Sequence, residues 1–222
     1  LGDGVNLIQG CHFICEDHPT DITLNPGGVF VSGVSPIVTV DSCTFMNIGQ
    51  SNSGNLIGCV DLYTAADSAI VTNCRFINAA YQPIKLQNAG QVLCSDHVIV
   101  NNRVASAVNY QPFVRGYSGS IPSAVISNVH ILGTSGSAIT LQGDPVDLPA
   151  TAVCDVFVSN IWAKDVQVSF LVLDRLKGNI KVSNCSVEGY NKSSTSTGYP
   201  VRFASNVSGT VRISGFRYKD GD

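Results

Sequence analysis

The chain has 222 residues, a formal net charge of −3 and a charged fraction of only 13%. Ordinary globular proteins have roughly 25% charged residues, and a protein that binds nucleic acid by neutralising phosphates is normally basic. The composition therefore argues against a nucleic-acid-binding protein. A hydrophobic fraction of 44% argues against a disordered chain. Since no apolar run reaches the ~18 residues of a membrane-spanning helix, we expect no membrane insertion.

The sequence begins at Leu1, with no initiator methionine and no recognisable signal peptide. A chain of 222 residues is long enough for one large all-β domain. We therefore expect one domain over residues 1–222, which would be an excerpt of a longer chain.

A six-residue pattern recurs eight times along the chain. In the copy Val71–Phe76 the first residue is aliphatic, the third is asparagine, the fourth is cysteine and the last is apolar. The copies begin at Ile8, Val40, Val71, Ile99, Ile126, Val158, Val182 and Ile213. Their spacing varies from 24 to 32 residues. Repeats of this length indicate a solenoid with coils of variable length.

A second, shorter pattern lies between these copies and alternates apolar and polar residues with a period of two. It begins at Val29, Val60, Ile84, Phe113, Ile139, Leu171 and Val201. This period is typical of strands, and no amphipathic helical stretch of 12 residues is present. Each coil would then have three short strands stacked at ~4.8 Å. The sequence predicts an all-β, right-handed parallel β-helix of about eight coils with three short sheets.

The third position of the repeat predicts an asparagine ladder at one corner of the solenoid. Asparagine tolerates the left-handed backbone that a sharp corner needs, and its amide can bond the copies above and below. The predicted ladder consists of Asn73, Asn101, Asn128, Asn160 and Asn184.

The fourth position predicts a column of buried thiols. Cys11, Cys43, Cys74 and Cys185 share it, and stacked side chains in register point the same way rather than at each other. We expect all eight cysteines to be free, as in a protein made in a reducing compartment. No Cys-x-x-Cys occurs, so a structural zinc site lacks its usual signature, and we expect no metal or cofactor.

The asparagine-cornered coils resemble the pectin-lyase-like right-handed β-helix superfamily over Gly4 to Tyr218. The resemblance implies that the asparagine corner joins the second and third sheets, and that a glycan groove runs along the first. The Asp-Asp pair of polygalacturonases and the Trp-x-Asp-His of pectate lyases are missing. The chain is therefore most similar to the body of a bacteriophage tailspike. Its expected partners are a bacterial polysaccharide and two further copies in a parallel homotrimer. The expected location is the virion tail, assembled in the reducing host cytoplasm, with a secreted protein as the alternative.

Candidate catalytic residues lie on or beside the first sheet, where neighbouring coils place carboxylates at the separations that glycoside hydrolysis requires. Asp144 and Asp174 are the preferred acid pair, and Asp61 is the next candidate. Aromatic, amide and cationic side chains beside them suit sugar faces, hydroxyls and acidic groups. The predicted substrate-binding residues are Tyr63, Lys85, Gln87, Arg115, Tyr117 and Gln142.

Two other functions compete with hydrolysis of a capsule, O-antigen or exopolysaccharide. A lyase or epimerase acting on uronates would use Lys85 or Arg115 as base or charge stabiliser. A non-catalytic adhesin or shaft would bind glycan without shortening it.

An outward apolar strip on the third sheet predicts a covered surface. Its expected members are Ile14, Met46, Ile77, Ala105 and Leu132. We interpret this strip as the subunit interface of the trimer or as a surface covered by a loop.

Overall fold

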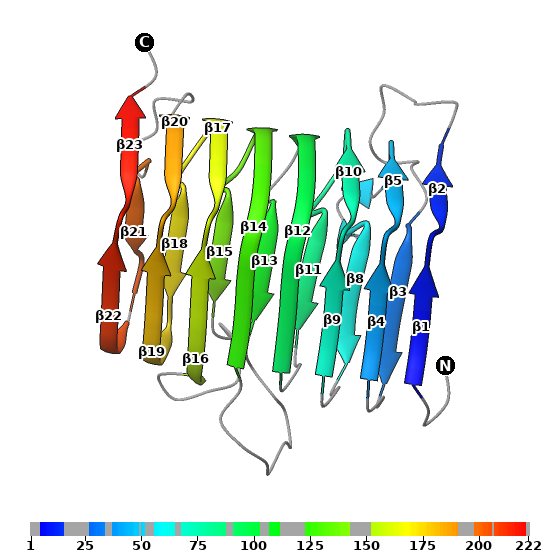
Figure 1. The fold of residues 1–222 in the computed structure, drawn as a ribbon, viewed down its shortest axis with the longest axis horizontal. Coiled ribbons are helices and arrows are strands. Elements are labelled where there is room, and N and C mark those ends of the chain that lie inside the picture. Colours follow the sequence, from blue (N-terminus) through cyan, green and yellow to red (C-terminus); the bar gives the residue numbers. More distant parts are fainter. Residues whose placement is uncertain are drawn as a thin grey trace.

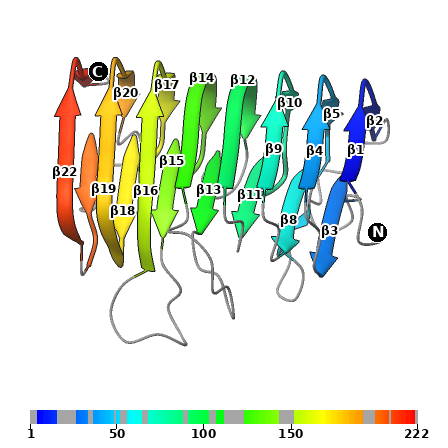
Figure 2. The same cartoon turned by 60° about the horizontal axis from the view of Figure 1, so that its bottom comes forward.

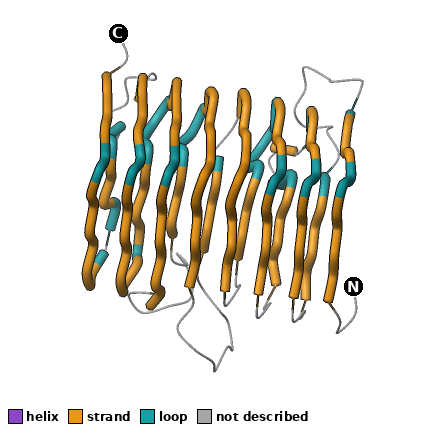
Figure 3. The backbone as a smooth tube through the Cα atoms, viewed as in Figure 1, coloured by secondary structure: helices purple, strands orange, loops and turns teal. Residues whose placement is uncertain are grey.

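The computed structural model of the chain describes residues 5–15, 27–33, 37–48, 50–51, 56–64, 68–87, 91–102, 107–111, 123–142, 152–190, 198–205 and 207–220. These residues form an elongated stack of strands in two facing layers, with the chain advancing along the long axis (Figures 1 and 2). Strands and connecting turns make up all of this described part, and no helix occurs in it (Figure 3). It accordingly holds no helix long and apolar enough to cross a membrane.

The larger sheet has 14 strands. Its main path is the parallel order β1-β4-β9-β12-β14-β16-β19-β22. These strands are β1 (Val5–Gln9), β4 (Ile37–Asp41), β9 (Ser68–Thr72), β12 (Gln91–Asn102), β14 (Ser123–Thr134), β16 (Ala152–Ser159), β19 (Leu176–Ser183) and β22 (Ser208–Ser214). The shorter strands that follow the corner are β2 (His12–Ile14), β5 (Thr44–Met46), β10 (Arg75–Ile77), β17 (Trp162–Val166), β20 (Ser186–Tyr190) and β23 (Arg217–Asp220).

The opposite layer is a seven-stranded parallel sheet in the order β21-β18-β15-β13-β11-β8-β3. Its strands are β3 (Val29–Gly33), β8 (Val60–Thr64), β11 (Ile84–Gln87), β13 (Val108–Gln111), β15 (Ile139–Gln142), β18 (Leu171–Asp174) and β21 (Val201–Phe203). A small antiparallel pair, β6 (Gln50–Ser51) and β7 (Leu56–Ile57), lies apart from both sheets.

The predicted fold class, an all-β parallel β-helix, is confirmed. The predicted second and third sheets are joined into the one 14-stranded sheet, because the corner between them is a single left-handed residue and β12 and β14 run through it. The path of this sheet has eight stacked strands and the opposite sheet has seven.

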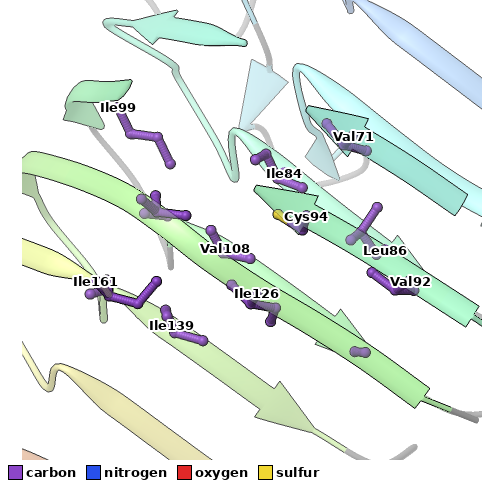
Figure 4. Close-up of a cluster of buried hydrophobic side chains, with 14 of the residues drawn as sticks. Val71, Ile84, Leu86, Val92, Cys94, Ile99, Val108, Ile126, Ile139 and Ile161 are labelled. Atoms are coloured by element: carbon purple, nitrogen blue, oxygen red, sulfur yellow. The ribbon is translucent and has the colours of Figure 1, made fainter. Parts of the chain in front are cut away.

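Alternation of side chains explains why these segments form strands. In β4, Val38 and Val40 are fully buried, while Ile37 and Thr39 are partly exposed. The inward residues of both sheets fill a single aliphatic core between the layers (Figure 4). Three phenylalanines, Phe13, Phe45 and Phe76, stack on successive rungs with ring centroids 4.9 and 5.1 Å apart. This offset stacking adds to the burial of their area.

The predicted corner is confirmed at four of its five asparagines. Asn73, Asn128, Asn160 and Asn184 have φ angles between 51° and 54°. The Asn160 amide donates to Asn128 Oδ1 at 3.1 Å, and the Asn128 amide donates to Asp96 Oδ1 at 3.0 Å. A second, unpredicted ladder joins the Asn78 amide to Asn47 Oδ1 at 3.1 Å.

The fourth copy of the repeat was wrongly placed. Cys94 aligns with Ile126, and Ile99 aligns with Ile131, so this copy begins at Cys94 and not at Ile99. The left-handed corner residue is therefore Asp96, with φ 62°, instead of Asn101. His97 then occupies the inward position that cysteine has on the three preceding rungs.

All eight cysteines are free, as predicted. Cys59, Cys74, Cys94 and Cys154 are buried, and burial raises the pKa of each thiol. A raised pKa disfavours the reactive thiolate, which is consistent with thiols that act as small apolar side chains.

The predicted apolar strip is present with one replacement. Val100 pairs with both Ile77 and Leu132, so it takes the position predicted for Ala105, which lies outside the described residues. Ile14 and Leu132 are 51% and 38% exposed. The apolar strip therefore consists of Ile14, Met46, Ile77, Val100 and Leu132.

Candidate functional site

The outward face of the seven-stranded sheet has one aligned column of side chains. Register across the sheet gives the order Phe30, Asp61, Lys85, Asn109, Thr140, Val172 and Arg202. The fourth position is Asn109, because the strand at this rung is Val108–Gln111 and not the predicted segment that begins at Phe113.

Asp61 and Lys85 form an ion pair on adjacent rungs, with Lys85 Nζ 3.5 Å from Asp61 Oδ2. The two side chains are only 19% (Lys85) and 5% (Asp61) exposed, although they point away from the solenoid core. Burial raises the pKa of Asp61, and the charge of Lys85 opposes part of this rise. A carboxyl group of this kind holds its proton to a higher pH than an ordinary aspartate.

Two buried oxygens in this column have no hydrogen-bond partner among the described residues. They are Asp61 Oδ1 and Asn109 Oδ1, on side chains that flank Lys85. Both residues are about 95% buried, with 4% and 5% exposure. Unpaired buried acceptors are costly and usually have a specific reason. Hydroxyl donors of a bound ligand would satisfy both of them.

Tyr81 belongs to the surroundings of Asp61. Burial, together with the negative charge of Asp61, raises the pKa of the Tyr81 phenol. The site therefore holds an acid with a raised pKa, an amine and a phenol whose ionisation depends on the carboxyl. Perturbed titratable groups of this kind are frequent at binding and catalytic sites.

A second polar group lies at the ends of β15 and β18. Gln142 aligns with Asp174, and its amide donates to Asp174 Oδ2 at 3.3 Å. Arg175 Nη2 lies 2.7 Å from the same oxygen, and the Ser205 hydroxyl donates to Asp174 Oδ1 at 2.5 Å. Three donors on one carboxylate therefore fix the position of the Asp174 side chain at the ends of these strands.

Asp61 and Asp174 cannot act on one glycosidic bond. They lie on β8 and β18, which are four rungs apart in the sheet order. At ~4.8 Å per rung this separates the strands by roughly 19 Å. Paired-carboxylate hydrolysis requires separations of about 5 to 9.5 Å. Each carboxyl would therefore need a different partner.

Several predicted site residues fall outside the described part of the chain. Asp144, Arg115 and Tyr117 do so entirely, and only the backbones of Tyr63 and Gln87 are described, paired with each other in β8 and β11. Of the predicted acid pair, the structure thus places Asp174 alone. Lys85, Asp61, Gln142 and Asp174 lie on the predicted sheet.

The sequence prediction missed Asn109, Tyr81, Arg175 and Ser205. Asn109 could have been found from the alternation of Val108-Asn109-Tyr110-Gln111, which matches Ile84–Gln87 residue for residue. The other three lie outside the strand pattern, and their approach to an aspartate depends on the coil geometry. The described residues contain no group of three or more histidine, cysteine, aspartate or glutamate side chains that could hold a metal ion.

Comparisons with known proteins give no relative for this chain: no family model, no curated protein and no solved structure matches it. The fold and the site geometry are therefore the basis for any functional assignment.

Proposed function

We propose that this chain is the β-helical body of a tailspike-like protein that binds a bacterial surface polysaccharide along the seven-stranded sheet and cleaves it. The observation that carries the proposal is the pair of buried, unpartnered oxygens of Asp61 and Asn109 on an outward face. A polymer of hydroxylated sugars supplies hydroxyl donors at regular intervals along such a face. The resemblance to the pectin-lyase-like superfamily points to the same sheet.

Hydrolysis is the proposed reaction, with Asp174 as the base or nucleophile of the acid pair. Its hydrogen bonds from Gln142, Arg175 and Ser205 hold the carboxylate in place. The proton donor would be Asp144, which follows Gln142 by two residues in the sequence. In this reaction the acid protonates the leaving glycosidic oxygen, while the base activates a water molecule or the carboxylate attacks the sugar directly.

Elimination at a uronate is the second candidate, and the Asp61–Lys85 pair favours it. A lyase needs a base that removes the proton next to the uronate carboxyl. A carbon–carbon double bond forms as the glycosidic bond breaks, and the leaving oxygen takes up a proton. Lys85 would be the base and Asp61, whose pKa is raised, would be the proton donor; Lys85 Nζ lies 3.5 Å from Asp61 Oδ2. The amine would bind the uronate carboxylate when charged and accept the proton when neutral.

Assembly and location are part of the same proposal. The exposed apolar strip would be covered by neighbouring copies in a parallel homotrimer. Eight free cysteines suit assembly in a reducing cytoplasm, before the protein acts outside the cell as part of a virion tail or as a secreted protein.

The deciding experiment is a sized digest of candidate capsules and O-antigens with the full-length protein and four variants: D61N, K85M, D144N and D174N. Hydrolysis predicts new reducing ends without near-ultraviolet absorption, with D174N and D144N each at least ~100-fold slower. Elimination predicts an absorbing product and a comparable loss in K85M. The control is K219Q, an exposed side chain on β23 of the other sheet, and it should retain the parent rate.

Binding without any shortening would reject both reactions and leave an adhesin or shaft. A parent protein that neither binds nor cleaves these glycans would reject the proposed function. If D61N and N109L bind as tightly as the parent, the unpaired oxygens do not contact the glycan.

A further inference from the structure

A second polar surface lies on the 14-stranded sheet, on the opposite layer from the Asp61 site. Phe157, Lys181 and Arg212 align on β16, β19 and β22 as one outward column. The same three residues line two adjoining shallow hollows with volumes of about 390 and 350 Å³. The column therefore forms a ridge with a hollow on each side.

The two hollows have different polar walls. One is bordered by three aligned serines, Ser159, Ser183 and Ser214. The other is bordered by Asp155, Asn179 and Thr210, which also align. Apart from Val158 and Val182, the residues that line the hollows thus form columns over three successive rungs, at ~4.8 Å intervals.

The cations of the ridge are available for a ligand. Within the described residues, neither Lys181 nor Arg212 forms an ion pair. Lys181 Nζ instead lies 5.0 Å from the centre of the Phe157 ring, a cation–π contact along the ridge. Asp155 carries the negative charge nearest these two cations in register. Its Oδ1 accepts hydrogen bonds from the Asn179 side-chain amide at 3.0 Å and from the Asn179 backbone N–H at 3.3 Å, so this oxygen is bonded within the second hollow.

We infer that this surface binds an acidic glycan, with sugar carboxylates on Lys181 and Arg212 and sugar hydroxyls on the serine row. Two adjacent cations select for negative charge, and arginine adds planar recognition of a carboxylate. Hydroxyl side chains at rung spacing provide donors and acceptors for a linear polymer that runs along the solenoid axis. Shallow, open hollows suit a chain that lies on the surface better than a small molecule that must be enclosed.

The surface is independent of the proposed reaction. It lies on the other sheet and contains none of the predicted catalytic residues, so it would hold an acidic polymer while the face around Asp61 engages another part of it. A variant can lose acidic-glycan binding at this surface and still cleave, and a variant can lose cleavage and still bind here. The two proposals can therefore be tested separately.

Binding of short polygalacturonate oligomers to the full-length protein tests this inference, with dextran oligomers of equal size as the neutral probe. We expect K181Q/R212Q to weaken polygalacturonate binding by about ten-fold or more, as for the loss of charge-assisted hydrogen bonds. The matched control K164Q/K219Q removes the same charge from β17 and β23 and should stay within about two-fold of the parent. F157L should weaken binding less than the double variant, since it removes only the contact that orients Lys181.

Three results would overturn the inference. The first is equal polygalacturonate affinity of K181Q/R212Q and K164Q/K219Q, which would mean that only the net charge of the protein affects binding. The second is equal affinity of the parent for dextran. The third is a change of oligomeric state in K181Q/R212Q by sizing, which would make the ridge a contact between copies of the chain. The turnover rate at saturating concentrations of a cleaved oligosaccharide too short to reach both surfaces, measured in parallel, should not change in the double variant.

Discussion

At the scale of single residues, position along the solenoid decides the chemistry of identical side chains. Asp41 receives hydrogen bonds from Asn73, Gln9 and Thr72, and these lower the pKa of Asp41 to about 2. Asp61 is buried beside one lysine, and burial raises its pKa. The first aspartate stabilises a corner in its charged form, whereas the second is suited to exchange a proton with a ligand.

His97 shows the same dependence in the core. It occupies the column of buried cysteines, its Nδ1 accepts from the Cys74 backbone N–H at 3.2 Å, and its ring packs edge-on against Phe76. Burial lowers the pKa of His97 to about 4. The neutral ring is therefore the form that fits the folded protein.

Replacing His97 by glutamine should remove an acid-sensitive part of the stability. The unfolded histidine has a pKa near 6.5 and the folded one near 4, so its contribution is complete above pH ~6.5 and is lost as the pH falls toward 4. The parent should lose up to roughly 3 kcal/mol more than H97Q between pH 7 and pH 4. Denaturant unfolding at both pH values measures this difference.

The control for this prediction is H130Q, on the exposed face of β14. It should retain the pH dependence of the parent. If H97Q retains it as well, protonation of His97 is not coupled to unfolding.

At the scale of elements, the corner ladder fixes the register between coils. A left-handed residue forms the corner of each coil without interrupting the sheet, and the side chains of Asn73, Asn128 and Asn160 bond the neighbouring rung. Asn128 does both, as donor to Asp96 and acceptor from Asn160. Its backbone conformation and its two hydrogen bonds are separate contributions, which two substitutions can distinguish.

We expect N128G to destabilise the protein by about 1 kcal/mol, because glycine tolerates the left-handed backbone but lacks the amide. N128A should cost about 2 kcal/mol, because alanine also has to adopt a left-handed conformation. The rate of proteolysis in denaturant, or reversible unfolding where it can be achieved, gives both values. Equal losses for the two variants would mean that the backbone conformation contributes little.

At the scale of the whole molecule, the outer surface changes character along the solenoid axis. The apolar strip occupies the column from Ile14 to Leu132, and the same column continues as Lys164, Glu188 and Lys219. An exposed apolar strip is normally covered by a partner. The polar end of the column is suited to remain in contact with solvent.

Charging the strip should therefore impair assembly. We expect M46D/I77D to shift the full-length trimer toward monomer or aggregate in sizing experiments, since two buried charges on each chain would be left without partners. The control Q91D/S123D places the same number of charges on β12 and β14, at aligned polar positions of another outward column, and should leave the oligomeric state unchanged. A stable trimer for M46D/I77D would show that the strip faces elsewhere.

The local sequence was sufficient for the architecture of this protein. Period-two alternation, an aliphatic residue at the start of each repeat and asparagine at the corner are properties of a few adjacent residues, and they predicted the strands, the parallel stack and most of the ladder. They also predicted the unpaired thiols, since equivalent positions in parallel coils point the same way.

Only the tertiary structure decided which residues share a rung where the local pattern is ambiguous. Ile99-Val100-Asn101 fits the repeat as well as Cys94-Ser95-Asp96, and pairing of His97 with Val129 across the sheet determined the register. The same register placed Asn109 beside Lys85 and gathered Arg175 and Ser205 on Asp174. These contacts arise from loop lengths and from which coil stacks on which. They join residues up to 32 positions apart, a distance over which a six-residue pattern carries no information.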